Sequence, residues 1–242
     1  MTRLWGMTDT MKPEEIKALL RDNTFLGGLP EDIFDGIHKR GHVARYGKGD
    51  VIFHRGDEGA NMMLILTGSV KVSNTTIDGR EAVLNFLGPG DVNGEITVLD
   101  GLDRTAAAIA LEPTEAFVIQ RRDLVPAILA NPDAMMEIIQ VLCGKLRVTS
   151  ALIEDGLNEM PGRTARGLLR LADQHGRNTK NGIVINLRLS QRDLGGYMGL
   201  SRENTSRQLA SLRQKGLITV DGPHIVIRDR AGLEAAADAV QD

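Results

Sequence analysis

A short stretch between Gly94 and Thr105 carries the residue types that bind a phosphate group. It opens with Gly94-Glu95, continues through an apolar turn that contains Ile96, and ends with Arg104-Thr105. Glycine lets backbone N–H groups approach a phosphate, arginine supplies a planar charged fork, and threonine adds a hydroxyl. A carboxylate in the same pocket is explained if the ligand also offers a sugar hydroxyl. The stretch therefore predicts a pocket for a sugar phosphate.

A second group of residues has the pattern of a helix pair that reads DNA. Ser190 and Asp193 have the spacing of a capping box, and Ser201, after the turn at Gly199, is a good N-cap for a second helix over about 201–215. Leu209 and Leu212 would anchor this helix from behind. Its first turns gather polar groups: Arg202, Glu203, Asn204, Ser206, Arg207 and Gln208. Arginine can donate twice to guanine and glutamate can accept from cytosine, so we expect the second helix to enter a major groove.

The distribution of charge along the chain agrees with this assignment. The whole sequence of 242 residues has a net charge of −3. Residues 161–230, however, hold 13 Lys and Arg against 5 Asp and Glu, whereas residues 1–160 hold 16 against 24. A basic segment on an acidic body indicates that one part of the chain meets a polyanion and that the other part has a different role.

Composition excludes several classes of protein. The single cysteine, Cys143, rules out a disulfide framework, a four-cysteine zinc site and a four-cysteine iron–sulfur cluster. No apolar run approaches the roughly 18 residues that span a bilayer, and the N-terminus lacks the apolar stretch of a signal peptide. We therefore expect a cytoplasmic protein with no membrane partner. Outside the phosphate-binding stretch the sequence shows no nucleophile–base pair, metal-ligand spacing or P-loop, so we do not expect an enzyme.

The order of predicted elements divides the chain. Residues 13–40 have the pattern of short helices, and residues 42–120 consist of short strands broken by glycine and aspartate, as in a small sandwich or barrel. The predicted strands are 51–53, 62–66, 69–72, 82–87 and 116–119. Asp78-Gly79 is a good two-residue hairpin turn.

The segment from Pro132 to about Asn158 predicts one long helix. Its apolar positions are Met135, Ile139, Leu142, Leu146 and Ile153, with Thr149 in the remaining place. These steps of three and four residues average the 3.5-residue period of a coiled-coil seam. Two interpretations are open: the helix lies on its own β domain, or it pairs with the same helix of a second subunit.

A break at Gly156–Pro161 predicts a hinge, followed by a smaller domain. We expect a helix over 161–175, a strand over 183–187, the helix pair described above and a hairpin formed by 217–220 and 224–227. The alanine-rich tail after Arg230 predicts a short helix.

From about residue 25 to 230 the sequence resembles the CRP/FNR family of bacterial transcription regulators, and specifically its cyclic-AMP receptor branch. The most specific stretches are Gly94-Glu95 with Arg104-Thr105, Val148-Thr149-Ser150, and Ser201 to Arg207. The resemblance implies an α+β fold of three parts. These are a jelly-roll β-barrel cyclic-nucleotide-binding domain over 1–131, a long dimerisation helix over 132–158, and a winged helix-turn-helix domain over 159–242.

The resemblance also implies roles for individual residues. Gly94, Glu95 and the adjoining Ile96 would hold the cyclic ribose phosphate, with Glu95 on the ribose 2′-hydroxyl, while Arg104 and Thr105 would bind the phosphate. Thr149, and Ser150 of the partner subunit, would contact the purine. Lys145 stands where the branch often has arginine, and lysine is a point charge rather than a fork. The residues implied in DNA binding are Ser190, Arg192, Ser201, Arg202, Glu203, Thr205 and Arg207.

These implied roles predict a homodimer that binds a palindromic, TGTGA-like double-stranded DNA operator when cyclic AMP is bound, with RNA polymerase as a further partner. Two alternatives are cyclic GMP, alone or beside cyclic AMP, and a constitutive DNA binder without an effector. Thr149 could instead set the register of the seam, and Arg104 could form a surface ion pair with Asp100 or Asp103. Haem-sensing relatives need axial ligands, and His38, His42 and His54 could be offered. Lone histidines in strands and helices are more often structural, so we expect no metal or haem.

Overall fold

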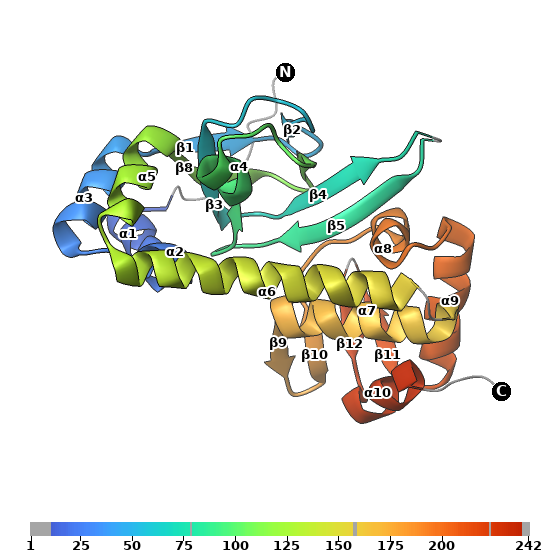
Figure 1. The fold of residues 1–242 in the computed structure, drawn as a ribbon. Helices are drawn as coiled ribbons and strands as arrows, with labels where there is room; N and C mark the ends of the chain where they lie inside the picture. Colours follow the sequence, from blue (N-terminus) through green and yellow to red (C-terminus); the bar gives the residue numbers. More distant parts are fainter. Residues whose placement is uncertain (1–10, 78, 157–158, 223, 239–242) are drawn as a thin grey trace, which may run out of the picture.

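The structure, a computed structural model, describes the chain except for residues 1–10, 78, 157–158, 223 and 239–242. A β-rich domain and a smaller C-terminal domain are connected by one long helix, as Figure 1 shows. No helix in the described part of the chain is long and apolar enough to cross a membrane.

The N-terminal domain is built from helices and two four-stranded antiparallel sheets. One sheet has the strand order β1-β8-β3-β6 and the other β2-β7-β4-β5. The strands are β1 (His42–Tyr46), β2 (Val51–Phe53), β3 (Asn61–Thr67), β4 (Val70–Thr75), β5 (Glu81–Leu87), β6 (Val92–Asn93), β7 (Ala107–Ala110) and β8 (Thr114–Gln120). The helices are α1 (Pro13–Asp22), α2 (Thr24–Gly27), α3 (Glu31–Arg40), α4 (Glu95–Asp100) and α5 (Arg121–Leu129). The two sheets pack face to face as the expected jelly roll.

Strand β3 contributes to two hydrophobic layers at once. Successive side chains of a strand point to opposite faces of the sheet. Met62, Leu64 and Leu66 therefore pack with the surrounding helices, while Met63 and Ile65 pack between the two sheets. All five side chains are buried. The continuous apolar run predicted as a strand is explained by this burial on both faces.

Four strands lie outside the predicted runs: β1, β6, β7 and β9 (Gly176–Thr179). β7 consists of three alanines and one isoleucine, and alanine has a low intrinsic preference for strands. It forms nevertheless, because it pairs with β2 on one side and β4 on the other. Of the expected hairpin turn, Asp78 lies outside the described residues, and Gly79 has the positive φ of +77° that such a turn requires.

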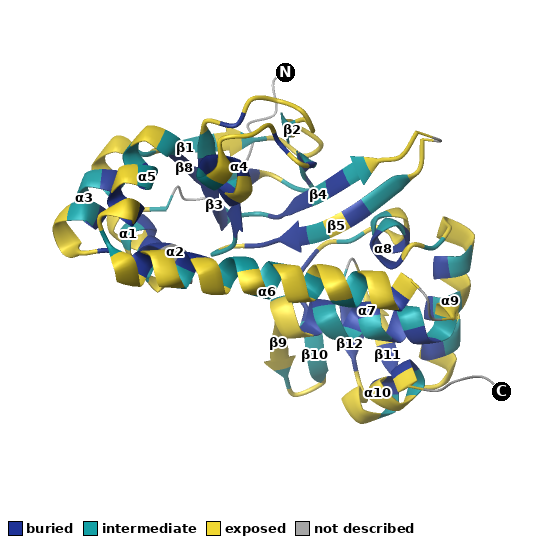
Figure 2. Ribbon diagram, viewed as in Figure 1, coloured by how far each residue is buried: buried dark blue, intermediate teal, exposed yellow. Residues whose placement is uncertain are grey.

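The long helix α6 (Pro132–Gly156) has one side packed against the β domain and another side that is exposed. Ala134 and Ile138 are buried in the core of the β domain, and Leu142 packs against that core. The other predicted seam residues stay between 37% and 68% exposed: Met135, Ile139, Leu146 and Ile153. Exposed positions recur along α6 in Figure 2. The helix therefore lies on its own β domain and still presents an apolar stripe to solvent.

The C-terminal domain has the architecture of a winged helix-turn-helix. Its helices are α7 (Met160–His175), α8 (Gln191–Met198), α9 (Arg202–Gln214) and α10 (Arg230–Asp238). Its strands β9, β10 (Gly182–Ile185), β11 (Ile218–Asp221) and β12 (His224–Ile227) form one sheet in the order β11-β12-β10-β9. The α+β fold class expected from the sequence is confirmed, with the β sheets, the long helix and the helix-turn-helix in the expected order.

The predicted helix caps are present. The Ser190 hydroxyl accepts a hydrogen bond from the Asp193 N–H at 3.1 Å, and the Asp193 carboxylate accepts one from the Ser190 N–H at 3.3 Å. Ser201 caps α9 by accepting from the Asn204 N–H at 3.2 Å. Gly199, with a φ of +64°, ends α8 in a left-handed conformation that favours glycine.

The hairpin of β4 and β5 connects the two domains. In Figure 1 it extends from the β domain toward α8. Val83 and Phe86 of β5 belong to the hydrophobic cluster of the C-terminal domain, and the Phe86 ring centroid is 5.4 Å from that of Tyr197. A Cβ atom at Gly196 would lie only 2.8 Å from Val83 Cγ2, so glycine permits the close approach of α8. One strand of the β domain thus helps to form the core of its neighbour.

Candidate functional site

A cavity of about 450 Å³ lies between the β domain and α6. Residues 92–97, which run from β6 into the start of α4, and residues 104–106, ahead of β7, form part of its wall. Val141, Gly144, Lys145, Val148 and Thr149 line it from α6. Gln174, at the end of α7, also lines the cavity, so the C-terminal domain borders it directly.

Arg104 is a buried cation in this cavity. Only 4% of the residue is exposed, and its guanidinium lies 4.2 Å from the centre of the Phe53 ring. Its Nη2 donates to the Asn61 carbonyl oxygen at 2.7 Å and to Asn61 Oδ1 at 2.9 Å. Burial lowers the pKa of Arg104, while the Glu95 and Asp57 carboxylates oppose that shift. The alternative of a surface ion pair with Asp100 or Asp103 is inconsistent with this burial.

The charge and one donor of the Arg104 guanidinium are not matched by the described protein groups around it. Among the described residues no carboxylate lies within ion-pair distance of Arg104, and its buried Nε has no hydrogen-bond partner. Buried polar groups in native proteins are nearly always satisfied, and a buried charge is normally paired. An unpaired buried guanidinium that lines a cavity is therefore suited to receive an anion.

Gly94 lets the chain pass close to this guanidinium. Its φ of +89° is left-handed, and a Cβ atom there would lie 2.3 Å from Arg104 Nη1. The Gly94 carbonyl oxygen accepts a hydrogen bond from the same Nη1 at 3.3 Å. Any other residue at position 94 would displace the arginine, which explains glycine at the start of α4.

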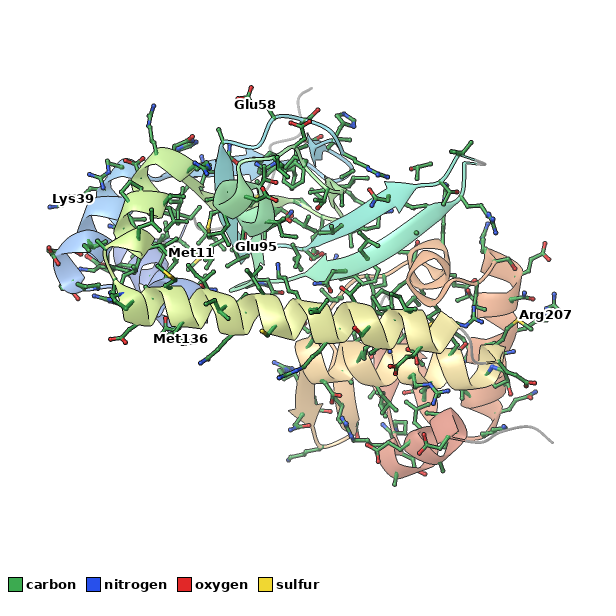
Figure 3. All side chains as sticks on the ribbon, viewed as in Figure 1. Met11, Lys39, Glu58, Glu95, Met136 and Arg207 are labelled. Carbon is green, nitrogen blue, oxygen red and sulfur yellow. The ribbon has the colours of Figure 1, made fainter. Side chains whose placement is uncertain are left out.

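Glu95 and Lys145 form an ion pair across the cavity. Lys145 Nζ is 2.6 Å from Glu95 Oε1, and the Glu95 side chain is almost fully buried. Lysine makes this contact through one atom, as expected of a point charge. Figure 3 shows Glu95 between α4 and α6. Together with Arg104 these are the charged residues that line the cavity, and their sum is one positive charge, which matches a ligand with one negative charge.

The remaining residues predicted for this pocket are placed as follows. Ile96 and Thr105 line the cavity, and so does Thr149, whose hydroxyl donates to the Lys145 carbonyl oxygen at 2.9 Å. Ser150 is exposed on α6 and does not line the cavity of its own chain. Phe53, Asn61 and Gln174 carry no local signal for this site in the sequence, because they lie in other elements and only the fold brings them here.

A second, open depression lies over the predicted recognition helix. Its lining includes Ser201, Arg202, Glu203 and Arg207, together with Gln191 of α8 and Ser206. In Figure 3 the Arg207 side chain projects from α9 away from the rest of the molecule. Forked arginines and a carboxylate therefore share one exposed face, which is the arrangement that reads base edges in a major groove.

The other residues predicted to bind DNA take different positions. Arg192 is exposed, whereas Ser190 and Ser201 use their hydroxyls as helix caps. Thr205 has no exposed surface, and its hydroxyl donates to the Ser201 carbonyl oxygen at 2.9 Å. Thr205 therefore supports the helix pair from within, and it presents no group to a groove.

The histidines do not form a metal centre within the described part of the chain, where no cluster of three or more His, Cys, Asp or Glu side chains could hold an ion. The His38 ring is stacked on Phe117, with the ring centroids 5.8 Å apart. His38 is therefore explained by packing.

Comparison with known proteins identifies a domain family for each of the two parts of the chain. Residues 43–131 match the model of the cyclic nucleotide-binding domain, and residues 162–236 match the Crp-like helix-turn-helix domain. The chain is 29% identical over 222 residues to the CRP-like cAMP-activated global transcriptional regulator of Mycobacterium tuberculosis, covering 91% of this chain and 99% of that protein.

Two further relatives extend the comparison. The cyclic AMP receptor protein of Thermus thermophilus is 31% identical over 193 residues, covering 79% of this chain and 86% of that protein. The structure of FixK2 from Bradyrhizobium japonicum superimposes with a TM-score of 0.75 at 26% identity, covering 83% of this chain and 99% of that chain. The chain therefore belongs to the CRP family of DNA-binding transcription regulators, which are not enzymes, and carries a cyclic nucleotide-binding domain.

Proposed function

We propose that this protein is a homodimeric transcription regulator whose affinity for a palindromic, TGTGA-like operator rises when cyclic AMP binds in the cavity beside α6. The single observation that carries the effector assignment is Arg104, a buried guanidinium with no carboxylate partner among the described residues. A cyclic nucleotide supplies the missing monoanion. The Mycobacterium and Thermus relatives are named for cyclic AMP, which supports adenine as the base.

In this proposal each cavity residue has one task. Arg104 and Thr105 bind the cyclic phosphate, Gly94 and Ile96 shape the wall, and Glu95 accepts from the ribose hydroxyl while Lys145 holds its carboxylate. Thr149 contacts the purine from α6, and Ser150 of the partner subunit contacts it from the other chain.

The dimer assignment is supported by the stripe of Met135, Ile139, Leu146 and Ile153 on α6, which is exposed in the single chain. A contiguous apolar stripe on a long helix is costly in water, and pairing with a second copy would cover it. Because Thr149 lies in this stripe and also lines the cavity, a bound base would sit where two subunits meet. Ligand binding would then alter helix pairing directly.

DNA binding in this proposal uses Arg202, Glu203 and Arg207 on base edges, with Arg192 near the phosphates and Ser190 and Ser201 at the helix ends. RNA polymerase is the further partner that we expect of such a regulator. Allosteric coupling is typically about 1–3 kcal/mol, so cyclic AMP should change operator affinity roughly 5- to 150-fold.

The decisive experiment is a calorimetric titration of the purified protein with cyclic AMP and cyclic GMP in parallel, followed by operator binding with and without the tighter ligand. We expect cyclic AMP to bind more tightly and to raise operator affinity. Equal operator affinity with and without saturating nucleotide would exclude the switch.

Cyclic GMP remains the second candidate effector, since the Thr149 and Ser150 hydroxyls can donate to or accept from either base. A constitutive DNA binder is disfavoured by Arg104, because a scaffold without a ligand gains nothing from an unpaired buried cation.

A further inference from the structure

Asn93 is a buried amide beside the phosphate-binding stretch that the proposed function does not yet use. It ends strand β6, directly before Gly94, and only 7% of the residue is exposed. Its backbone pairs with Met63 of β3, so the position of its Cα is fixed by the sheet. Asn93 is one of the residues that line the 450 Å³ cavity.

The amide nitrogen of Asn93, Nδ2, is buried and makes no hydrogen bond to any residue in the described part of the chain. A buried donor without an acceptor loses its hydrogen bonds to water and forms none in the protein, so it destabilises the folded state by its full desolvation penalty. An apolar side chain would fill the same place at lower cost, so the amide in the ligand-free chain calls for an explanation.

The neighbours of Asn93 indicate what the missing acceptor is. The next two residues in the chain are Gly94 and Glu95, and Arg104 contacts the Gly94 carbonyl oxygen. Lys145, whose Nζ pairs with Glu95 at 2.6 Å, also reaches the carbonyl oxygen of Val92 at 3.5 Å. The amide therefore lies in the wall where the proposed function puts the sugar and phosphate of the ligand, and those groups are rich in oxygen acceptors.

We infer that Asn93 is a ligand-binding residue: its Nδ2 donates a hydrogen bond to a ribose or phosphate oxygen of the cyclic nucleotide. This inference rests on the proposed function. It adds a neutral donor beside the two cations Arg104 and Lys145. The amide is unsatisfied in the free protein, and the hydrogen bond formed on ligand binding removes that unfavourable free energy.

The inference predicts effects of opposite sign in one variant. Asn93→Leu removes the unpaired donor, so the thermal midpoint of the ligand-free protein should stay the same or rise by about 2–4 °C. The same variant removes a contact to the ligand, so its affinity for cyclic AMP should fall roughly 5- to 10-fold. A residue with a purely structural role would lower the midpoint and leave affinity unchanged.

Asn23→Leu is a matched control. Its Nδ2 donates to the Gly90 carbonyl oxygen at 2.9 Å and its Oδ1 accepts from the Leu26 N–H at 3.2 Å, outside the cavity. This variant should lower the thermal midpoint and keep wild-type affinity for cyclic AMP. Asn93→Ala, which removes the same donor with less bulk, should lose affinity even if leucine does not fit the strand.

The titration uses cyclic AMP and its 2′-deoxy analogue on the full-length protein. A loss in Asn93→Leu that persists with the analogue identifies a phosphate oxygen as the acceptor, and a loss that disappears identifies the ribose hydroxyl. Wild-type affinity in both Asn93 variants would overturn this inference alone. A wild-type protein that binds neither cyclic AMP nor cyclic GMP would overturn the proposed function as well.

Discussion

Lys71 of β4 lies 2.9 Å from the carboxylate of Asp193 on α8, a residue that follows it by 122 positions. The same ammonium is 2.8 Å from Glu81 of β5, and only 10% of its side chain is exposed. Burial pulls the pKa of Lys71 down, but its contacts with Glu81 and Asp193 outweigh burial and raise that pKa above its ordinary value. Because Asp193 also caps α8, one carboxylate both starts the helix pair and holds it on the β domain.

Lys71→Met should therefore weaken the contact between the domains. The change leaves Glu81 and Asp193 without their shared cation, and an uncompensated buried polar group costs about 1–3 kcal/mol or more if charged. We expect a lower free energy of unfolding in urea. Lys17→Met, at the exposed pair with Asp35, is the control and should have a much smaller effect. Equal urea midpoints for Lys71→Met and the wild type would contradict a stabilising role.

Arg104→Ala should abolish most of the nucleotide affinity. In the proposed complex Arg104 pairs with the cyclic phosphate. Removing one partner of a buried, hydrogen-bonded charge pair costs about 2–5 kcal/mol, which corresponds to a fall in nucleotide affinity of roughly 30-fold or more. Calorimetric titration with cyclic AMP measures this loss. Arg45→Ala, which deletes a 63%-exposed guanidinium on β1, is the matched control and should bind like the wild type. Unchanged titration heats in Arg104→Ala would refute its role.

Arg207→Ala should lower DNA affinity in a sequence-dependent way. If Arg207 donates to a guanine edge, its loss costs about 1–3 kcal/mol on the preferred operator and much less on an operator with that base pair changed. Fluorescence anisotropy on the two DNA sequences separates the effects. Arg192→Ala is the comparison, since loss of a phosphate contact should weaken both sequences equally. An equal loss on both operators for Arg207→Ala would reassign it to the phosphates.

Leu146→Glu should convert the proposed dimer to a monomer. Leu146 is 67% exposed in the single chain, and a two-fold pairing of α6 would bring the two introduced carboxylates close together. Like charges in such an interface cost several kcal/mol. Sedimentation velocity measures the result, with Gln140→Glu, elsewhere on the same helix, as the control that should stay dimeric. A wild type that sediments as a monomer would contradict the dimer itself.

Local signals in the sequence predicted the local structure well. The capping box of Ser190 and Asp193, the cap at Ser201 and the glycine turn between them are all contacts over a few residues, and all are present. The burial of Leu209 and Leu212 also followed from helical spacing. The alanine-rich strand β7 could not be predicted, since its pairing partners β2 and β4 rather than its own residues stabilise it.

Contacts between residues far apart in the sequence could be predicted only in part. Arg104 and Gly94 were grouped from their residue types, yet the roles of Asn61 and Phe53 in holding the guanidinium depend on the meeting of distant strands. The sequence predicts Asp193 only as a helix cap. Its contact with Lys71 joins residues 122 positions apart, and no local pattern in the sequence indicates such a contact. Thr205, assigned to DNA by its place in a motif, is buried because its helical spacing turns it toward α8.

His175 should make stability depend on pH. Its Nε2 lies 3.1 Å from the Phe86 carbonyl oxygen, and its Nδ1 is 3.9 Å from the carboxylate of Asp91, which faces it from the β domain. Burial lowers the pKa of His175, and the opposing effects of Asp91 and the Phe86 carbonyl do not restore it. The folded protein thus binds fewer protons than the unfolded chain once pH falls below about 6.5, the ordinary pKa of histidine.

The contribution of the neutral imidazole is therefore present above about pH 6.5 and is lost as pH falls from there through the lowered pKa. His175→Gln keeps an amide donor for the Phe86 carbonyl but cannot titrate. We expect thermal midpoints of the wild type to drop more steeply than those of His175→Gln between pH 7 and pH 5, about two units across the ordinary histidine pKa. His42→Gln, at an exposed strand position, should retain the wild-type slope. Parallel profiles for His175→Gln and the wild type would show that protonation of this imidazole does not oppose the docking of α7 on β5.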